Sequence, residues 1–272
     1  MKRLKIGIVG CGAIGSSLAK TIVKDFSRQA QLAALYDIDE AKARRLSRVV
    51  SKNGDLFFGL KRLISKSGLV IEAASAKSSW AIARAVLSAG RDIMIMSVGG
   101  VVDRAEGLER LARKYKAKVY IPSGAISGID ALKAAAVKKI KRVVITTRKH
   151  PLSFKGVAYV SAKGIALDKL KKDKVLFSGP AKEAVKYFPQ NINVAAVLSL
   201  AGIGSRKTQV KIIASLKAKR NTHEIQIDSD SGRIFTRTEN VLHPDNPKTS
   251  YLAVLSAIAT LKQIVRPVVI GT

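Results

Sequence analysis

The sequence has few of the residues that disulfide-stapled domains, metal centres and aromatic binding platforms require. Its 272 residues include one cysteine, Cys11, which excludes an internal disulfide and fits a reducing compartment. With three histidines and that cysteine we find no convincing ligand set and predict no metal site. Aromatic residues make up 5% and do not alternate with basic ones, so a stacking platform for single-stranded nucleic acid is not supported.

Long hydrophobic runs are also missing. The longest stretches without a charge or a strong breaker, such as residues 194–204 and 251–261, are shorter than the ~20 residues that cross a bilayer. The first residues are basic, but the apolar stretch after them is too short and too glycine-broken for a signal peptide. We therefore expect a cytoplasmic protein without a membrane partner.

Acidic residues are scarce, since 19 Asp and Glu stand against 49 Lys and Arg, a net charge of +30. Such a charge raises the question of a nucleic-acid partner. The basic residues are spread in small clusters, however, and neither zinc-finger spacing nor basic heptads occur. Because 47% of residues are hydrophobic, the chain is not a disordered basic tail. We interpret the charge as a solvated surface and do not predict nucleic-acid binding.

The first 122 residues alternate short apolar runs with helix-period stretches. The pattern predicts strands at residues 6–9, 32–36, 69–74, 92–96 and 118–121, separated by helices. Alternation of this kind is typical of right-handed crossovers and a parallel sheet with helices on both faces. The fold class predicted here is α/β, with a Rossmann-type domain at residues 1–122.

After Pro122 the predicted strands and helices no longer alternate regularly. Strands are predicted at residues 142–148, 209–214, 223–228 and 233–239, and the last two flank a Ser-Asp-Ser-Gly turn that indicates a hairpin. Helices are expected near residues 126–137, 181–187, 194–201 and 249–265. Residues 123–244 are therefore predicted to form a catalytic α+β domain with a mostly antiparallel sheet, while a C-terminal helical segment, 245–272, joins the first domain.

A glycine-rich motif follows the first predicted strand and opens the first predicted helix. It reads Gly10, Cys11, Gly12, Ala13, Ile14 and Gly15, the G-x-G-x-x-G pattern that places a pyrophosphate at a helix N-terminus. Asp37 ends the second predicted strand, 22 residues beyond Gly15, where a carboxylate can accept hydrogen bonds from a ribose. The combination predicts NAD binding and leaves NADP open, since Lys42 and Arg44 follow. The Cys11 thiol is interpreted as a small filler rather than a reactive group.

Three histidines are candidates for proton transfer. His223 shares strand parity with Ile225 and Ile227, so its side chain points to a face that we expect the other domain to cover. Position alone favours a core histidine over a catalytic one. His150 and His243 each precede a proline and are interpreted as surface or turn residues.

Five segments together resemble the L-aspartate dehydrogenase family of archaea and some bacteria. They are residues 8–15 (IVGCGAIG), 121–128 (IPSGAISG), 188–195 (FPQNINVA), 221–225 (NTHEI) and 246–251 (NPKTSY), in the family's order. The resemblance implies oxidation of L-aspartate to iminosuccinate with NAD or NADP, in a protein expected to be a homodimer. Iminosuccinate would then hydrolyse to oxaloacetate and ammonia or enter NAD biosynthesis.

The resemblance also implies roles for particular residues. It assigns acid/base catalysis to His223, against the core interpretation, and an imidazole of pKa near 6.5 suits removal of a proton from an α-ammonium group. It places nicotinamide contacts on Ala125 and on Asn191 and Asn193, with helix capping as the alternative for the two asparagines. The start of the predicted last helix, at Lys248, Thr249 and Ser250, is a candidate contact for the anionic substrate.

Two alternatives remain open. The same fold would serve another NAD(P)-linked oxidoreductase, of the homoserine dehydrogenase or dihydrodipicolinate reductase type, although the His223 segment and residues 246–250 argue against it. A non-catalytic protein that binds dinucleotides or nucleic acid is the second alternative, motivated by the charge.

Overall fold

The computed structural model describes residues 3–51, 55–188, 193–244 and 246–271, without the side chains of 246–248. The chain divides into two compact units. Unit 1 consists of Met1–Pro122 and Val254–Ile270, and unit 2 consists of Ser123–Ala253 and Gly271–Thr272. Within the described residues no helix is long and apolar enough to cross a membrane.

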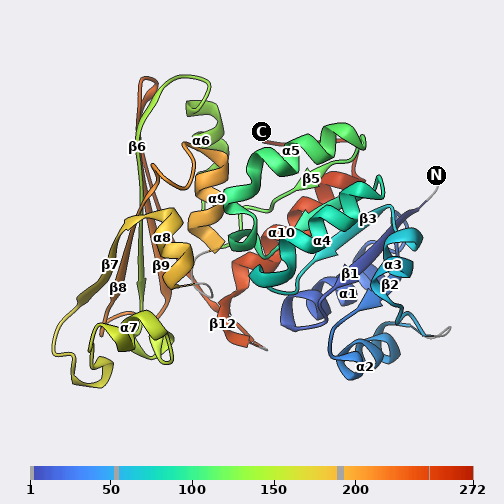
Figure 1. Cartoon of the computed structure of the whole chain (residues 1–272), viewed down its shortest axis with the longest axis horizontal. Coiled ribbons are helices and arrows are strands. Elements are labelled where there is room, and N and C mark those ends of the chain that lie inside the picture. The colour runs from blue at the N-terminus through green and yellow to red at the C-terminus, as the bar shows by residue number, and fades with distance from the viewer. Residues whose placement is uncertain (1–2, 52–54, 189–192, 245, 272) are drawn as a thin grey trace. The chain divides into compact units, whose positions relative to one another are not determined.

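Unit 1 is built on a parallel five-stranded sheet in the order β2-β1-β3-β4-β5 (Figure 1). Its strands are β1 (Leu4–Val9), β2 (Ala30–Tyr36), β3 (Leu69–Glu72), β4 (Asp92–Ile95) and β5 (Val119–Tyr120). Its helices are α1 (Ala13–Asp25), α2 (Glu40–Val50), α3 (Leu60–Lys66), α4 (Ala76–Ser88), α5 (Ala105–Lys114) and, from Val254 onward, α10 (Tyr251–Val265), with short 3-10 turns η1 (Val98–Gly100) and η2 (Val102–Arg104). The predicted Rossmann-type sheet is confirmed.

The central strand β1 is buried on both faces, as a parallel strand covered by helices must be. Ile6 and Ile8 belong to the core that includes residues of α1, α2 and α10. Gly7 points the opposite way, where a built Cβ would lie 2.8 Å from Leu63 of α3. Helices therefore pack on both faces, and α3 approaches closely because residue 7 has no side chain.

Unit 2 contains a mixed five-stranded sheet in the order β10-β9-β6-β8-β7. The strands are β6 (Ile140–Lys149), β7 (Lys174–Pro180), β8 (Gln209–Ala214), β9 (Asn221–Ser229) and β10 (Gly232–Asn240), and a separate pair is formed by β11 (Leu242–His243) and β12 (Asn246–Ser250). The helices are α6 (Ile129–Ala135), α7 (Ala158–Ala162), α8 (Ala181–Tyr187) and α9 (Asn193–Ala201), with 3-10 turns η3 (Pro151–Phe154) and η4 (Leu167–Lys169). Only β6 and β8 pair in parallel, so the mostly antiparallel sheet is confirmed.

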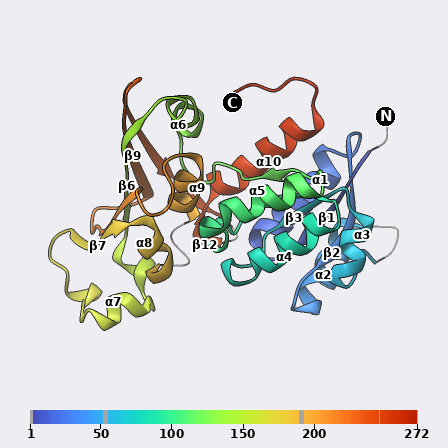
Figure 2. The ribbon, with the colours of Figure 1, turned by 45° about the horizontal axis from the view of Figure 1, so that its top comes forward.

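One face of this sheet carries the core of unit 2. Figures 1 and 2 show α8 and α9 along that face. The cluster that contains Val143, Ile145, Ile225 and Ile227 also includes five buried residues of these two helices, Ala181, Ala184, Val194, Ala195 and Leu198. The apolar residues that share this face with His223 thus pack against helices of their own unit.

The predicted start of the last helix is also wrong. Thr249 and Ser250 lie in β12, where Ser250 pairs with Leu242 of β11, and α10 begins at Tyr251. The helix ends at Val265, as the predicted range 249–265 has it, because Pro267 has no N–H and disfavours helical backbone at Arg266. Outside this helix, the described residues of the predicted segment 245–272 are not helical.

Candidate active site

The glycine-rich loop of unit 1 has two positions that cannot hold a side chain. Gly10 has φ +97°, and a built Cβ would lie 2.4 Å from the carbonyl oxygen of Ala73. A Cβ on Gly15 would lie 1.9 Å from the carbonyl oxygen of Gly10. The loop is therefore held tightly between β1, α1 and the segment after β3.

Gly12 differs, because apart from its neighbours in the chain no atom lies within 4 Å of the position where its Cβ would be. Gly12 is the N-cap of α1, and Ser16 N donates to its carbonyl oxygen at 2.8 Å. The N–H groups at the start of α1 thus lie beside open space that a side chain at 12 would fill. The arrangement fits a pyrophosphate, as expected at the carboxyl edge of a parallel sheet.

Asp37 connects this loop to the end of β2. Its Oδ2 accepts from Cys11 N at 2.7 Å, and its Oδ1 accepts from Asp39 N at 2.9 Å. The carboxylate remains half-buried and adjacent to the loop, where a ribose hydroxyl would reach it. Lys42 and Arg44 are ion-paired, with Asp39 at 3.3 Å and Asp55 at 2.7 Å.

The Cys11 thiol is buried, with Sγ 3.7 Å from the carbonyl oxygen of Tyr36. Burial, together with the charge of Asp37, raises the pKa of this thiol to about 12. A protonated thiol is a poor nucleophile, which agrees with the interpretation of Cys11 as a filler.

Sequence reasoning missed Glu72, the last residue of β3. Its side chain is fully buried, and its two oxygens accept from Ala74 N at 2.9 Å and Ser97 N at 3.0 Å. Burial raises the pKa of this carboxyl, against the opposing effect of those N–H donors. Glu72 therefore ties together the loops after β3 and β4, on the same edge as Gly10. The sequence did contain a signal for it, since Glu72 is an acidic residue at the end of an apolar run.

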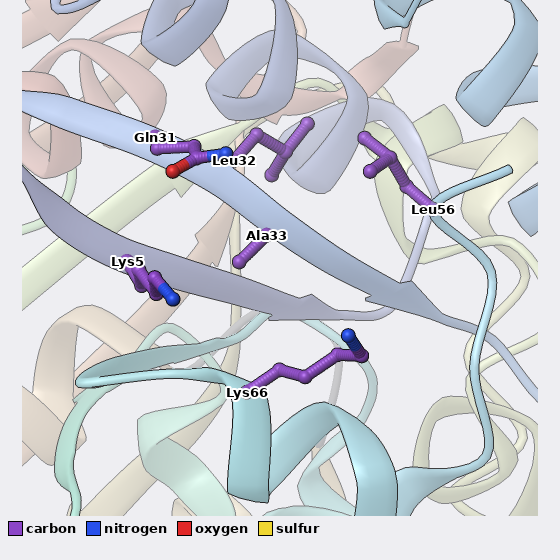
Figure 3. Close-up of a pocket in the computed structure, with 6 residues that line it drawn as sticks. All are labelled: Lys5, Gln31, Leu32, Ala33, Leu56 and Lys66. Carbon is purple, nitrogen blue, oxygen red and sulfur yellow. The ribbon is translucent and has the colours of Figure 1, made fainter. Parts of the chain in front are cut away.

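A depression in unit 1 is lined by residues nearer the start of β1 and β2, among them Lys5 and Gln31, together with Lys66 (Figure 3). It does not include the glycine-rich loop or Asp37. The dinucleotide features thus belong to the other end of the sheet.

At one end of the unit 2 sheet, the face that carries the core has buried polar residues in place of apolar ones. His223 of β9 pairs with Thr147 of β6, and Thr147 Oγ1 lies 2.9 Å from His223 Nδ1. His223 is 3% exposed. Burial, and secondarily the charge of Lys149, lowers the pKa of His223 to about 3. In the substrate-free protein the imidazole is therefore neutral.

Two asparagines extend this polar end. Asn221 Nδ2 lies 3.3 Å from Ser250 Oγ, and Asn240, paired with Asn221 across the hairpin, donates from Nδ2 to the carbonyl oxygen of Ala125 at 2.9 Å. Asn240 Oδ1 is buried and has no hydrogen-bond partner among the described residues. A buried acceptor of this kind is costly unless a ligand donor reaches it, so the end of the sheet beside Ala125 fits a polar ligand.

Comparison with known proteins agrees with both units. The family described as "Homoserine dehydrogenase, NAD binding domain" matches residues 10–122, and "Aspartate dehydrogenase, C-terminal" matches residues 130–264. L-Aspartate dehydrogenases of Methanosarcina barkeri and Methanosarcina acetivorans are 46% and 47% identical to this chain, each over 99% of it and 100% of the relative. The chain belongs to the L-aspartate dehydrogenase family.

A solved structure supports this membership. The crystal structure of aspartate dehydrogenase from Thermotoga maritima has a TM-score of 0.72 at 26% identity and covers 99% of this chain and 100% of that one. Unit 1 is thus an NAD-binding domain of an L-aspartate dehydrogenase family member.

The remaining candidate residues are only partly described. Ala125 is buried, and Asn193 is exposed as the first residue of α9. Asn191 and the side chain of Lys248 lie outside the described residues, while Ser250 is buried beside Asn221.

The other two histidines lie away from His223 in the chain and differ in burial. His150 is exposed and caps η3 through Nδ1. The prediction of His243 as a surface residue is wrong, because its ring is buried and packs edge-on against Tyr251, 5.4 Å between centroids. Over the described residues, no group of three His, Cys, Asp or Glu could hold a metal ion.

Proposed function

We propose that the chain oxidises L-aspartate to iminosuccinate with NAD or NADP, and that His223 is the acid/base residue. The observation that carries the assignment is a buried, neutral imidazole whose Nδ1 is held by Thr147. Membership of the L-aspartate dehydrogenase family supplies the substrate. Residues 123–244 are then the catalytic domain, and residues 1–122 with the C-terminal helix are the dinucleotide domain.

The dinucleotide is proposed to contact the loop from Gly10 to Gly15, with its pyrophosphate at Gly12 and its adenosine ribose at Asp37. A 2′-phosphate would meet the Asp37 carboxylate, and Lys42 and Arg44 already have carboxylate partners. We therefore expect NAD to be preferred over NADP. Ala125, Asn191 and Asn193 remain the proposed contacts of the nicotinamide half.

The proposed chemistry needs a proton acceptor at the substrate nitrogen. When Nδ1–H of His223 donates to Thr147 Oγ1, the lone pair is on Nε2, which can accept a proton from the α-ammonium group. The deprotonated nitrogen can then assist loss of hydride from Cα, and the bound dinucleotide supplies the hydride acceptor. In the reverse direction the imidazolium returns the proton.

The substrate is proposed to contact residues at the polar end of the sheet. Ser250 is buried and bonded to Asn221, two residues before His223, and Lys248 and Thr249 precede it in β12. These three residues stay candidates for the substrate carboxylates.

The test is absorbance at 340 nm with L-aspartate and NAD or NADP, and then with oxaloacetate, ammonia and the reduced cofactor. L-Homoserine and L-malate serve as controls for the related oxidoreductases. Turnover with aspartate is expected in both directions, with a lower KM for NAD than for NADP. Turnover with homoserine but not aspartate would overturn the proposal.

We further propose a cytoplasmic homodimer. The face of the unit 2 sheet opposite its core carries exposed apolar side chains, Val175 at 46% and Phe235 at 64% exposure, which a second copy would cover. Light scattering coupled to size exclusion tests the dimer. Nucleic acid is not a proposed partner, and a salt titration of duplex binding that showed tight binding at physiological salt would contradict this.

A further inference from the structure

Lys149, the last residue of β6, is a buried cation on the face that carries His223. It is 6% exposed, and it lies two residues beyond Thr147, whose hydroxyl contacts His223. Alternate residues of a strand point to the same face, so Thr147 and Lys149 share one. Arg148, between them, points to the opposite face and pairs with Glu224 at 3.5 Å.

Most residues on the face of the sheet that carries Lys149 and His223 are uncharged. Across residues 143–149 of β6, and across β9 and β10, the other residues that share the face of His223 are uncharged. They change from valine and isoleucine in the core to Thr147, Asn221 and Asn240 at the end where Lys149 lies. On β8 the residue opposite Lys149 is Ala214. Beyond Ala214, on β7, lies Lys174, which is exposed. His223 and Lys149 are thus the buried titratable groups that these strands bring to this face.

A cation beside the proposed base works against that base in the empty protein. Lysine is seldom buried to this extent because its charged form loses solvation, and burial lowers the pKa of Lys149 to about 8. Its charge also lowers the pKa of His223. Both effects reverse when an anion comes close, since a negative charge stabilises the ammonium and offsets its action on the imidazole.

We propose that Lys149 binds a carboxylate of the substrate next to His223, a role that rests on the proposed function. Aspartate has two carboxylates and one α-ammonium group. A cation beside the base can therefore bind a carboxylate, which does not react, while the base takes the proton of the ammonium group. The same contact makes the base effective only when the substrate is present, because the carboxylate neutralises the charge that suppresses His223.

The experiment compares Lys149→Met, which removes the charge but keeps a long side chain, with Lys149→Arg, which keeps the charge. Lys211→Met is the matched control, since Lys211 is an exposed cation of β8. Loss of a charge-assisted contact predicts that Lys149→Met raises the KM for aspartate about 10- to 100-fold. Lys149→Arg should stay within several-fold of the wild type, and Lys211→Met should not change.

Two readouts separate substrate binding from a structural role. Calorimetric titration of the NADH-loaded protein with succinate, a dicarboxylate that cannot be oxidised at an amine, should show at least tenfold weaker binding in Lys149→Met. The wild-type KM for aspartate should rise above pH ~8, as Lys149 loses its proton, and Lys149→Arg should lack that rise. A buried lysine replaced by methionine is not expected to lower the melting temperature.

The outcomes also separate this inference from the proposed function. A wild-type protein that does not oxidise aspartate would overturn the proposed function, whatever the variants do. A wild type that oxidises aspartate, with Lys149→Met unchanged in both KM and succinate affinity, would overturn the role of Lys149 alone.

Discussion

Because His223 is buried in its neutral form, the folded protein should lose stability in mild acid. A substitution at His223 that removes the titrating group should reduce this loss. The pKa of His223 is about 3 in the folded chain, against 6.5 for an ordinary histidine. Because the folded pKa is depressed, the unfolded chain binds the proton first, and stability is lost as the pH falls below 6.5. At pH 4.5 the loss is roughly 3 kcal/mol, since each pH unit below 6.5 costs ~1.4 kcal/mol.

The substitution is His223→Gln, which keeps a polar side chain near Thr147 but does not titrate. Urea unfolding followed by circular dichroism at pH 7.0 and 4.5 gives the free energy of unfolding for each protein. Carboxylates titrate in both proteins, so the wild type should lose roughly 2–3 kcal/mol more than the variant between the two pH values. Equal losses would show that His223 is protonated in the folded chain and would refute the reasoning.

The other predictions concern unit 1. Gly15→Ala should lower the melting temperature strongly, because its Cβ would overlap the Gly10 carbonyl oxygen, whereas Gly12→Ala should melt like the wild type but bind NADH at least tenfold more weakly by fluorescence titration. Equal melting of the two variants would contradict the loop geometry. Glu72→Gln should cost about 2–3 kcal/mol of unfolding free energy in urea, because one backbone N–H loses its acceptor, while the exposed control Glu106→Gln should have no effect. If Glu72→Gln leaves the free energy of unfolding unchanged, Glu72 does not join the two loops.

Much of the fold could be predicted because its signals are local. Apolar runs, helix periodicity and the glycine motif lie within short stretches, and they indicated the parallel sheet and the hairpin of β9 and β10. Helix α3, strand β7 and the pair of β11 and β12 were not predicted. Strand β7 follows a lysine-rich stretch, and its pairing with β8, about 30 residues further on, outweighs a weak local pattern. Strand β12 contains Pro247, and it pairs with the nearby β11 despite that proline.

The site was less predictable because its contacts are long-range. Thr147 and His223 are 76 positions apart in the chain and meet through the register of β6 and β9. Lys149 and Glu72 are ordinary charged residues in the sequence, and only their burial sets them apart. His243 shows the converse, since a residue before proline looks like part of a turn but packs against Tyr251.

The central claim is that His223 moves the proton during aspartate oxidation. The most direct measurement is kcat for L-aspartate in His223→Ala, beside the Kd for NADH measured by fluorescence on the same protein. If His223 is the base, the variant should keep the wild-type Kd for NADH, and its kcat should fall by about 10²- to 10⁴-fold, the usual contribution of a general base. A variant that keeps the wild-type kcat would contradict this role and return His223 to the core of unit 2.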